Sequence, residues 1–237
     1  ASESIMKIYN KNNFKVNYKI DKSPLTDADV TSNKIIIDEL EKISKDPVVS
    51  EESHIEYKIR KNFKKFWLID PLDGTKDFIS KNGQFTVNIA LIYNNQPILG
   101  VVCVPKTGDV YYAIKNGGAY KNGVQIFNNS KREGLIGADS RFHSSEQTKA
   151  FFKKYNIKKI QKYGSSIKLC KLAEGIIDVY PRLNGTKEWD TAASHIIVQE
   201  AGCKIIDIES KKELLYNKKS FKNNYFIACR NNLSFEL

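Results

Sequence analysis

The sequence predicts an α/β protein, in detail an α+β chain with an antiparallel-rich first half and an α/β second half. From Gln84 to Gly123, apolar and polar residues alternate between short turns rich in Asn and Gly, as in antiparallel sheets. Beyond Arg132, strand-length apolar runs alternate with helix-length segments, which is typical of an α/β arrangement. With 237 residues, 41% of them hydrophobic, the chain can bury a large core. We expect the boundary between residues 1–133 and 134–237, without a flexible linker.

The first 65 residues are expected to hold two helices and two short strands. Pro24 interrupts the chain, and Thr26 is a good N-cap for the second helix. The charged stretch 54–65 follows as a surface loop or short helix. In order, the expected elements are a helix over 2–10 with Ile5 and Ile8 inward, a half-buried strand through Val16, Tyr18 and Ile20, a helix from Thr26 to about Ile43 with Ile36, Leu40 and Ile43 at helical spacing, and a strand over 47–50.

The stretch FWLIDPLDGTKDF, residues 66–78, is the one around which the other motifs are arranged. Its apolar start predicts a short buried strand that stops at Asp70-Pro71, because proline cannot donate to a sheet ladder. Asp73-Gly74 then supplies a tight turn. Two carboxylates are left at the end of a buried strand, where they repel each other unless a cation such as Mg²⁺ lies between them.

Gly74 and Thr75 follow the second acid and offer backbone N–H groups and a hydroxyl that suit a phosphate. Asp, Pro and Gly are also the commonest residues of plain surface turns, and a bare D-x-x-D spacing would favour that interpretation. The buried strand before the acids and the Gly-Thr pair after them favour a metal and phosphate site instead.

The elements after this motif follow in regular succession. In the first half they are a strand over 84–93 with Phe85, Val87, Ile89 and Leu91 on one face, a central strand over 97–104, and short antiparallel strands over 109–114 and around the turns 117–118 and 122–123. In the second half they are strands over 135–138, 157–160, 176–180 and 204–208, alternating with helices over 144–155, 166–174 and 190–201.

The net charge of +11 would suit an anionic partner, but it is weak evidence for nucleic acid. Only five of the 38 basic residues are Arg, on which readers of base edges rely, and the lysines are scattered. No run approaches the ~18 apolar residues of a membrane helix. The N-terminus lacks a signal-peptide pattern, and because it begins within an expected helix, we expect that a few native residues precede it.

The four cysteines are expected to be reduced thiols in a cytoplasmic protein. They are far apart in the sequence and form no C-x-x-C pair, which argues against a zinc site or a redox dithiol. They are Cys103, Cys170, Cys203 and Cys229.

Two further acids stand at the ends of expected elements, where α/β folds gather their sites. Glu51 closes a short strand in VVSEES, and Asp190 opens the helix DTAASHIIVQEAG. Taken alone, Asp190 would be an ordinary helix cap worth about 1 kcal/mol, and Glu51 an ordinary exposed acid. Of the histidines nearby, His54 is expected on the surface and His195 in the core rather than as a ligand.

The run WLIDPLDGTKDF, the upstream SEE and the downstream WDTAA together resemble the inositol monophosphatase superfamily over nearly the whole chain. The resemblance implies a Mg²⁺-dependent, lithium-sensitive phosphomonoesterase with the layered αβαβα sandwich shared with fructose-bisphosphatase. The runs NGQFTVNIALI, YGSSIKLCKLAEG and YPRLNGTKEWDTAA are most similar to the 3′(2′),5′-bisphosphate nucleotidase branch. Inositol monophosphatases usually have Asn before the Phe of the motif, where this chain has Asp77.

Carried over position by position, the resemblance implies a set of metal ligands and a residue pair that activates water. The implied ligands are Glu51, Asp70, Asp73, Asp190 and the main-chain carbonyl of Leu72. Asp29 is implied to pair with Thr75. Because Asp27 is close by in LTDAD, the choice of Asp29 as the inward acid rests on the T-x-x-D spacing.

The resemblance also implies contacts to a nucleotide substrate, from Gly74, Thr75, His143, Ser165, Lys168 and Arg182. Some of these residues have simpler explanations: His143 as a loop residue, Ser165 as a helix cap and Lys168 as a solvated lysine. Arg182 is harder to explain otherwise, because arginine is scarce in this chain and its planar fork suits a phosphate.

The mechanism expected from the resemblance uses two or three Mg²⁺ ions around one phosphate. A metal-bound water, deprotonated with help from Thr75 and Asp29 or from Glu51, attacks phosphorus directly, and Asp190 with its metal stabilises the departing ribose hydroxyl. The expected substrate is adenosine 3′,5′-bisphosphate, which gives AMP and phosphate, with its sulfated relative PAPS as a second substrate. An inositol monophosphatase or general sugar-phosphate phosphatase is the nearest alternative, and a non-catalytic basic nucleic-acid-binding protein a remote one. We expect a monomer with no nucleic-acid partner.

Overall fold

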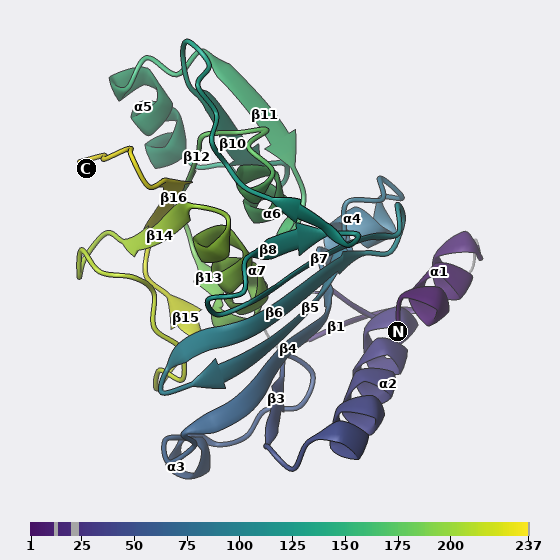
Figure 1. Cartoon of the computed structure of the whole chain (residues 1–237). Coiled ribbons are helices and arrows are strands. Elements are labelled where there is room, and N and C mark those ends of the chain that lie inside the picture. The colour runs from purple at the N-terminus through teal and green to yellow at the C-terminus, as the bar shows by residue number, and fades with distance from the viewer. Residues whose placement is uncertain (12–13, 20–23, 237) are drawn as a thin grey trace.

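The structure, a computed structural model, describes residues 1–11, 14–19 and 24–236. Its elements stack in five layers and confirm the predicted αβαβα sandwich (Figure 1). In order, the layers are the helices α1 (Ser2–Asn10) and α2 (Asp27–Ile43), a seven-stranded sheet, the helices α6 (Ile167–Ala173) and α7 (Glu188–Glu200), a five-stranded sheet, and α5 (Glu146–Lys154).

The seven-stranded sheet has the strand order β3-β4-β5-β6-β7-β8-β9. Every neighbouring pair is antiparallel, as predicted, except the first: β3 runs parallel to β4 because the chain crosses over through the short helix α3 (Tyr57–Arg60). The strands are β3 (Val48–Ser50), β4 (Lys65–Asp73), β5 (Thr86–Tyr93), β6 (Gln96–Val104), β7 (Asp109–Ile114), β8 (Ala119–Lys121) and β9 (Val124–Ile126).

The five-stranded sheet has the order β11-β10-β12-β16-β14. The strands are β10 (Ile136–Ser140), β11 (Lys159–Tyr163), β12 (Val179–Arg182), β14 (Cys203–Asp207) and β16 (Phe226–Arg230). The first three are parallel, and β16 lies antiparallel between β12 and β14. No strand was predicted beyond residue 208, so β16 differs from the prediction. The boundary near residue 133 stays a prediction; it lies in the connection between β9 and β10.

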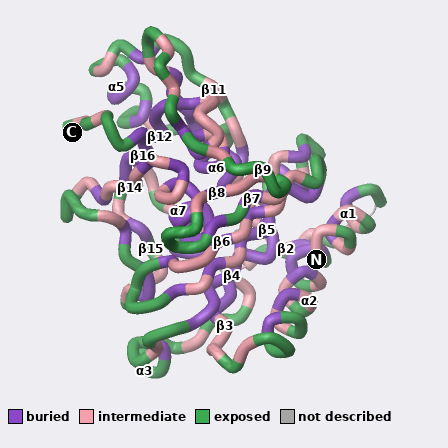
Figure 2. The backbone as a smooth tube through the Cα atoms, viewed as in Figure 1, coloured by how far each residue is buried: buried purple, intermediate pink, exposed green. Residues whose placement is uncertain are grey.

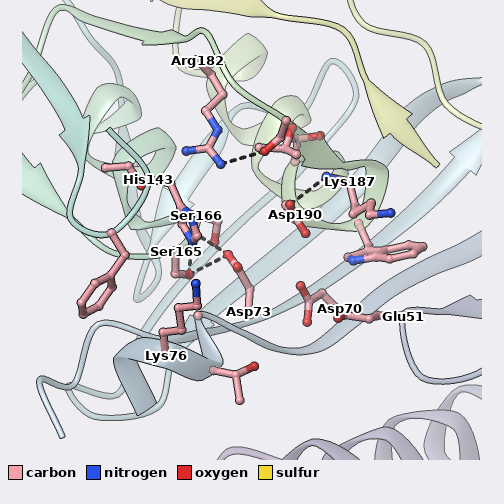
Figure 3. A pocket seen from close by; sticks show the side chains of 18 of the residues that line it. Glu51, Asp70, Asp73, Lys76, His143, Ser165, Ser166, Arg182, Lys187 and Asp190 are labelled. Atoms are coloured by element: carbon pink, nitrogen blue, oxygen red, sulfur yellow. Dashed lines mark hydrogen bonds between the residues drawn. The ribbon is translucent and has the colours of Figure 1, made fainter. Parts of the chain in front are cut away.

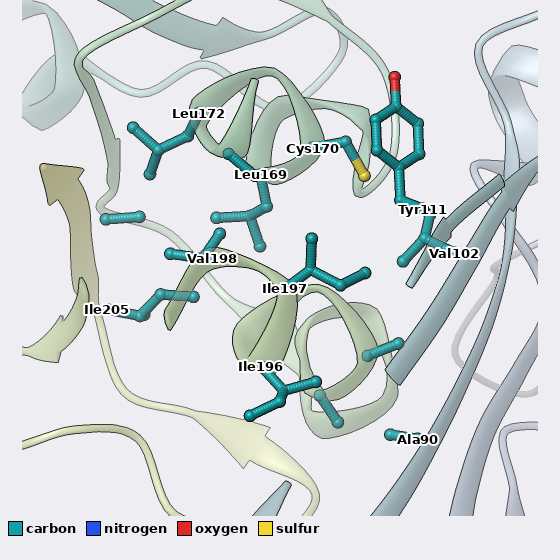
Figure 4. Close-up of a cluster of buried hydrophobic side chains, with 14 of the residues drawn as sticks. Ala90, Val102, Tyr111, Leu169, Cys170, Leu172, Ile196, Ile197, Val198 and Ile205 are labelled. Atoms are coloured by element: carbon teal, nitrogen blue, oxygen red, sulfur yellow. The ribbon is translucent and has the colours of Figure 1, made fainter. Parts of the chain in front are cut away.

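Helix α7 lies between the two sheets and holds the core together (Figure 4). One buried cluster joins Val102 of the first sheet, Ile197 of α7 and Ile205 of the second sheet. The helix approaches β6 so closely that a Cβ added to Gly100 would lie 2.2 Å from the carbonyl oxygen of Ala193. In Figure 2 the buried part of the chain accordingly runs through the centre of the molecule, and the exposed part lies mainly at loops and outer helix faces.

Helix α2 has Thr26 as its N-cap, as predicted, and Thr26 forms a full capping box with Asp29. Ile36 and Leu40 are buried, but Ile43, the last residue of the helix, is 76% exposed. In the pair formed by β1 (Val16–Tyr18) and β2 (Pro24–Thr26), Tyr18 is 72% exposed, so the predicted inward face of that strand is wrong. The predicted extension of that strand to Ile20 lies outside the described residues.

Strand β4 does not stop at Asp70-Pro71 but continues to Asp73. Its register against β5 shifts between Asp70 and Asp73, so Pro71 lies in a bulge where its missing N–H breaks no ladder bond. The turn that follows contains Gly74 at a φ of 88°, and it opens a short helix, α4 (Thr75–Ile79), that the sequence analysis did not predict. The bulge and this turn present both acids at the same end of the sheet.

The described residues contain no helix that combines the length and apolar content needed to cross a bilayer. All four cysteines are unpaired, and all but Cys103 are buried. His195 is buried as predicted, with Nδ1 2.9 Å from the hydroxyl of Tyr216.

Candidate active site

All the predicted site residues except Asp29 line one cavity of about 550 Å³ between the two halves of the molecule. Figure 3 shows acids on one side of it and a group of cationic and hydroxyl side chains on the other. The acids are Glu51, Asp70, Asp73 and Asp190, of which Asp73 lies next to Ser165, and the opposite group contains His143, Ser165, Ser166 and Arg182. Lys168 also lines the cavity. The cavity therefore brings together residues from both sheets and from both halves of the chain.

Three of the predicted metal ligands form a compact cluster. Glu51 follows β3, Asp70 belongs to β4 and Asp190 lies in the first turn of α7, and one carboxylate oxygen from each lies within 4.8 Å of the others. Asp190 is held by its own helix, because its Oδ2 accepts a hydrogen bond of 2.8 Å from the backbone N–H of Lys187. This cap is compatible with a ligand role, because it fixes the carboxylate at the helix end next to the other two acids.

Asp70 fits a cation site better than a purely structural role. It is 1% exposed, and its Oδ1 accepts the backbone N–H of Leu72 at 3.0 Å. Its Oδ2 is buried and has no hydrogen-bond partner among the described residues. Burial, and then the nearby carboxylates of Glu51 and Asp73, raise the pKa of Asp70 well above its usual value. A divalent cation would satisfy the unpaired oxygen and remove the repulsion.

Lys19 supplies positive charge at the outer side of this cluster. Its Nζ lies 2.7 Å from a carboxylate oxygen of Glu51 and 2.7 Å from one of Glu52. Burial still raises the pKa of Glu51, although Lys19 opposes that shift. No role was predicted for Lys19, because its partner Glu51 lies 32 residues away in the sequence.

Asp73 faces the same cavity from the other end of the bulge. Its Oδ2 accepts hydrogen bonds from the hydroxyl of Ser165 at 2.8 Å and from the backbone N–H of Ser166 at 2.7 Å. The main-chain carbonyl of Leu72 accepts a bond of 3.4 Å from Thr75 Oγ1. Asp73 thus connects the acids to the second half of the chain.

The predicted pair of Asp29 and Thr75 is formed. Thr75 Oγ1 lies 3.2 Å from Asp29 Oδ1, while Asp29 Oδ2 accepts the N–H of Thr26 at 2.7 Å and its hydroxyl at 2.6 Å. Burial raises the pKa of Asp29 to about 6, against the effect of the Thr26 hydrogen bonds. Asp27 is exposed, so the acid that faces inward is the one that the T-x-x-D spacing indicates.

Ser165 has a strained backbone for a residue other than glycine, with a φ of 52°. A Cβ added to Gly74 would lie 3.2 Å from the Cβ of Ser165, so the absence of a side chain at Gly74 lets the two loops meet. The two loops therefore meet at Gly74, directly before α4.

Lys168 is not a solvated lysine: it is 4% exposed, and its Nζ donates to the carbonyls of Ser165 at 2.7 Å and Tyr163 at 3.2 Å. Burial, and then the charge of Arg182, lower the pKa of Lys168 to about 8. Arg182 is also buried, and it donates from Nη2 to the carbonyl of Gly185 at 2.9 Å. Its Nε has no partner in the part of the chain that the structure describes.

His143 lies on the loop after β10, beside this cationic group. Burial, and then Arg182, Lys76 and Lys168, lower the pKa of His143 to about 4, so its imidazole is neutral at physiological pH. His54, expected in a charged surface stretch, is exposed but also lines the cavity. Its ring stacks on Trp189 with a centroid distance of 5.2 Å, a contact that no local pattern indicates.

Comparisons with known proteins agree on one family. The family model described as "Inositol monophosphatase family" matches residues 1–233. The 3′(2′),5′-bisphosphate nucleotidase CysQ of Buchnera aphidicola is 44% identical over 213 residues, which cover 86% of this chain and 79% of the relative. CysQ of Escherichia coli K12 is 39% identical over 232 residues, 95% of this chain and 94% of the relative.

Solved structures give the same result for the fold. The crystal structure of CysQ from Bacteroides thetaiotaomicron, described as a bacterial member of the inositol monophosphatase family, superposes with a TM-score of 0.87 at 36% identity. The superposition covers 98% of this chain and 93% of that one.

Proposed function

The chain belongs to the inositol monophosphatase family, and we propose that it is a 3′(2′),5′-bisphosphate nucleotidase that removes the 3′-phosphate of adenosine 3′,5′-bisphosphate. The products are AMP and inorganic phosphate, and PAPS is a second substrate. The observation that carries this proposal is the cavity itself, in which a carboxylate cluster with an unpaired Asp70 oxygen faces the buried cations Lys168 and Arg182. The first group suits a metal and the phosphate that is cleaved; the second suits a phosphate that is retained.

The acids would hold two or three Mg²⁺ ions. Glu51, Asp70 and Asp190 are close enough to share one ion, and Asp73 and the carbonyl of Leu72 line the same cavity. When bound, Mg²⁺ supplies positive charge that stabilises the phosphoryl group and the leaving oxygen and makes water more acidic. The acids keep the ions at the end of β4, next to the backbone N–H groups of Gly74 and Thr75.

In the proposed reaction, water attacks phosphorus, the bond from phosphorus to the ribose 3′-oxygen breaks, and that oxygen takes up a proton. Thr75 Oγ1 orients the water, and Asp29, 3.2 Å from that hydroxyl, accepts the proton that the water loses; Glu51 is the alternative acceptor. The backbone N–H groups of Gly74 and Thr75 hold the phosphoryl oxygens. Asp190 would hold an ion that stabilises the charge developing on the leaving oxygen. No residue of the chain becomes phosphorylated.

The retained 5′-phosphate would bind on the opposite side of the cavity. Arg182 and Lys168 supply charge that is buried and held in place by main-chain carbonyls. Ser165 contributes a hydroxyl, and the neutral imidazole of His143 contributes a hydrogen bond or a packing surface for the nucleoside. An inositol monophosphate has no second phosphate to use these cations.

A comparison of two substrates tests the proposal. Phosphate release should be faster, by at least about tenfold in kcat/KM, from adenosine 3′,5′-bisphosphate than from inositol 1-phosphate. It should require Mg²⁺ and stop on chelation.

Asp73→Asn should lower the rate by about 100-fold or more, since it removes a charge from the metal site. Wild-type Mg²⁺-dependent activity in that variant would contradict the metal assignment, and a preference for inositol 1-phosphate would contradict the substrate.

We place the enzyme in the cytoplasm as a monomer. Four unpaired cysteines support a reducing compartment. Light scattering coupled to gel filtration measures the oligomeric state, and fractionation of cells that express the protein measures the compartment.

A further inference from the structure

Asp77 of α4 is a buried acid of the cavity that the mechanism above does not use. It is 4% exposed and lines the cavity on the side of the cationic group. Its Oδ1 accepts a hydrogen bond of 2.6 Å from Asn82 Nδ2, and Arg141 Nε lies 3.9 Å from the same oxygen. A carboxylate kept out of solvent needs a positive neighbour to stay charged. For Asp77, the positive neighbours come from two loops on the cationic side of the cavity.

The first of these loops is the connection from β11 to α6. A Cβ added to Gly164 would lie 2.6 Å from Asp77 Cγ, so the backbone of this loop packs directly on the carboxyl group. Lys168 is held by the carbonyls of the same loop, and charge attraction runs between Lys168 and Asp77. The loop cannot move away from α4 without separating these charges.

The second loop follows β10 and contains His143. Arg141 begins it, with its backbone N–H donating to the carbonyl of Tyr163 at 3.2 Å and its guanidinium beside Asp77. Both loops thus contact Asp77. Asp77 belongs to the first half of the chain, which carries the DPLDGT motif, and both loops belong to the second half.

We propose that Asp77 is a positioning residue that uses its negative charge to fix the Arg141 loop and the connection from β11 to α6, and that it thereby sets the affinity for substrates with a second anionic group. This inference rests on the proposed function of the same cavity. In this role Asp77 acts without contacting the substrate or the reacting atoms. It acts on the retained phosphate through Lys168 and on the nucleoside through the loop of His143.

Asp77→Asn tests this, because asparagine keeps the shape and the acceptor for Asn82 and removes only the charge. The KM for adenosine 3′,5′-bisphosphate should rise about tenfold, as expected for the loss of coupling between charged neighbours, while kcat changes less than about twofold. The inhibition constant of inorganic phosphate, which needs only the metal side, should stay within about twofold. A KM within twofold of the wild-type value overturns the proposal, and so does an equal rise in KM and in the inhibition constant of inorganic phosphate.

Asp207→Asn is the matched control. Asp207 is another buried acid, which accepts hydrogen bonds from the backbone N–H groups of Glu209 and Ser210, but it does not line the cavity. Its neutralisation should leave KM unchanged. If Asp77→Asn does not fold, Arg141→Gln decides, because that side chain is 38% exposed. It should raise KM in the same direction, and an unchanged KM in that variant overturns the proposal.

A pH profile separates positioning by charge from a merely structural role. In Asp77→Asn, Lys168 loses a negative neighbour and its pKa falls, so the alkaline fall of kcat/KM should move to lower pH. Adding Lys168→Arg should move that fall back to higher pH, because arginine stays protonated. An alkaline limb that stays in place overturns the role of charge. The charged groups that face Lys168 are Arg182 of β12, Asp73 of β4, Asp77 of α4 and Asp139 of β10.

The wild-type assay with adenosine 3′,5′-bisphosphate is done first and tests the proposed function alone. The dissociation constant of AMP, measured by calorimetry, tests the inference without turnover, since AMP carries the retained phosphate. It should rise about tenfold in Asp77→Asn even if the bisphosphate is not hydrolysed, and an unchanged value overturns the inference.

Discussion

Asp70 illustrates how its position turns an ordinary carboxyl group into one that depends on a cation. The strand of which it is part is buried, and two further acids approach it from other elements. Its folded pKa is raised, by burial first, while the unfolded pKa is ordinary. Between these two values the folded protein binds more protons than the unfolded one, so metal-free stability falls as the pH rises.

Binding of Mg²⁺ requires the deprotonated carboxylates and removes their repulsion. The rise in melting temperature on adding Mg²⁺ should therefore be larger at about pH 8 than at about pH 5.5. Asp70→Asn should raise the metal-free melting temperature at about pH 8 and reduce the effect of Mg²⁺. Differential scanning fluorimetry with and without chelator measures both. An effect of Mg²⁺ that is independent of pH would show that these acids do not bind it.

Asp29 should act on the chemical step rather than on binding. Asp29→Asn is expected to lower kcat by about 100-fold with little change in KM, since a proton acceptor is lost. Protonation of Asp29, whose pKa is raised to about 6, also predicts an acidic fall in the wild-type rate that the variant lacks. Steady-state rates across pH measure this. A variant with the same acidic limb would assign that limb to another group. Asp38→Asn, on the exposed part of α2, is the control.

At the residue scale, the sequence indicated the acids well and their partners poorly. Asp70 and Asp73 belong to a local motif, and the burial of Asp29 follows from helix spacing and a cap. The links of Asp77 to Arg141, of Lys19 to Glu51 and of His54 to Trp189 join segments that meet only in the folded chain. Local patterns carry no information about such contacts. The roles of the site residues stay predictions.

At the element scale, the regular helices and strands were predictable because their apolar spacing reflects the layer on which they pack. Strand β5 illustrates the limit. Both of its faces are covered by other layers, but the alternation of its apolar residues predicts only one buried face. The extension of β4 past Pro71 was missed because a bulge removes the usual conflict between proline and a ladder. The late strand β16 lies in a segment without a helix to mark its start.

Gly100 gives an element-scale prediction about the contact between β6 and α7. Gly100→Ala would place a methyl group 2.2 Å from the carbonyl oxygen of Ala193, so the helix must shift. We expect a loss of about 3 kcal/mol of unfolding free energy, measured by urea denaturation. Gly185→Ala is the control, since no atom lies within 4 Å of its added Cβ. Equal stability of the two variants would mean that the helix is not held against the strand.

At the scale of the whole molecule, the two halves recognised in the sequence share one core. Helix α7 comes from the second half, yet it packs on β5 and β6 of the first, and the largest buried cluster includes residues of both sheets. The predicted boundary near residue 133 therefore divides the chain in sequence without dividing its core.

The full chain should consequently unfold in a single cooperative transition, with equal calorimetric and van't Hoff enthalpies. A fragment of residues 134–237 should lack the near-ultraviolet circular dichroism of packed aromatic residues, because α7 would lose the sheet that covers it. A fragment that folds alone, or two separate transitions in the full chain, would contradict a shared core.

The division of the cavity into an acidic and a cationic side has a consequence for how its two ligands bind. A phosphate placed between Asp70 and Asp190 is repelled until divalent ions neutralise them, while Lys168 and Arg182 attract the other end of the nucleotide in any case. Ion and nucleotide must then strengthen each other's binding. Because such coupling is reciprocal, the nucleotide raises the affinity for the ion by the same factor by which the ion raises the affinity for the nucleotide.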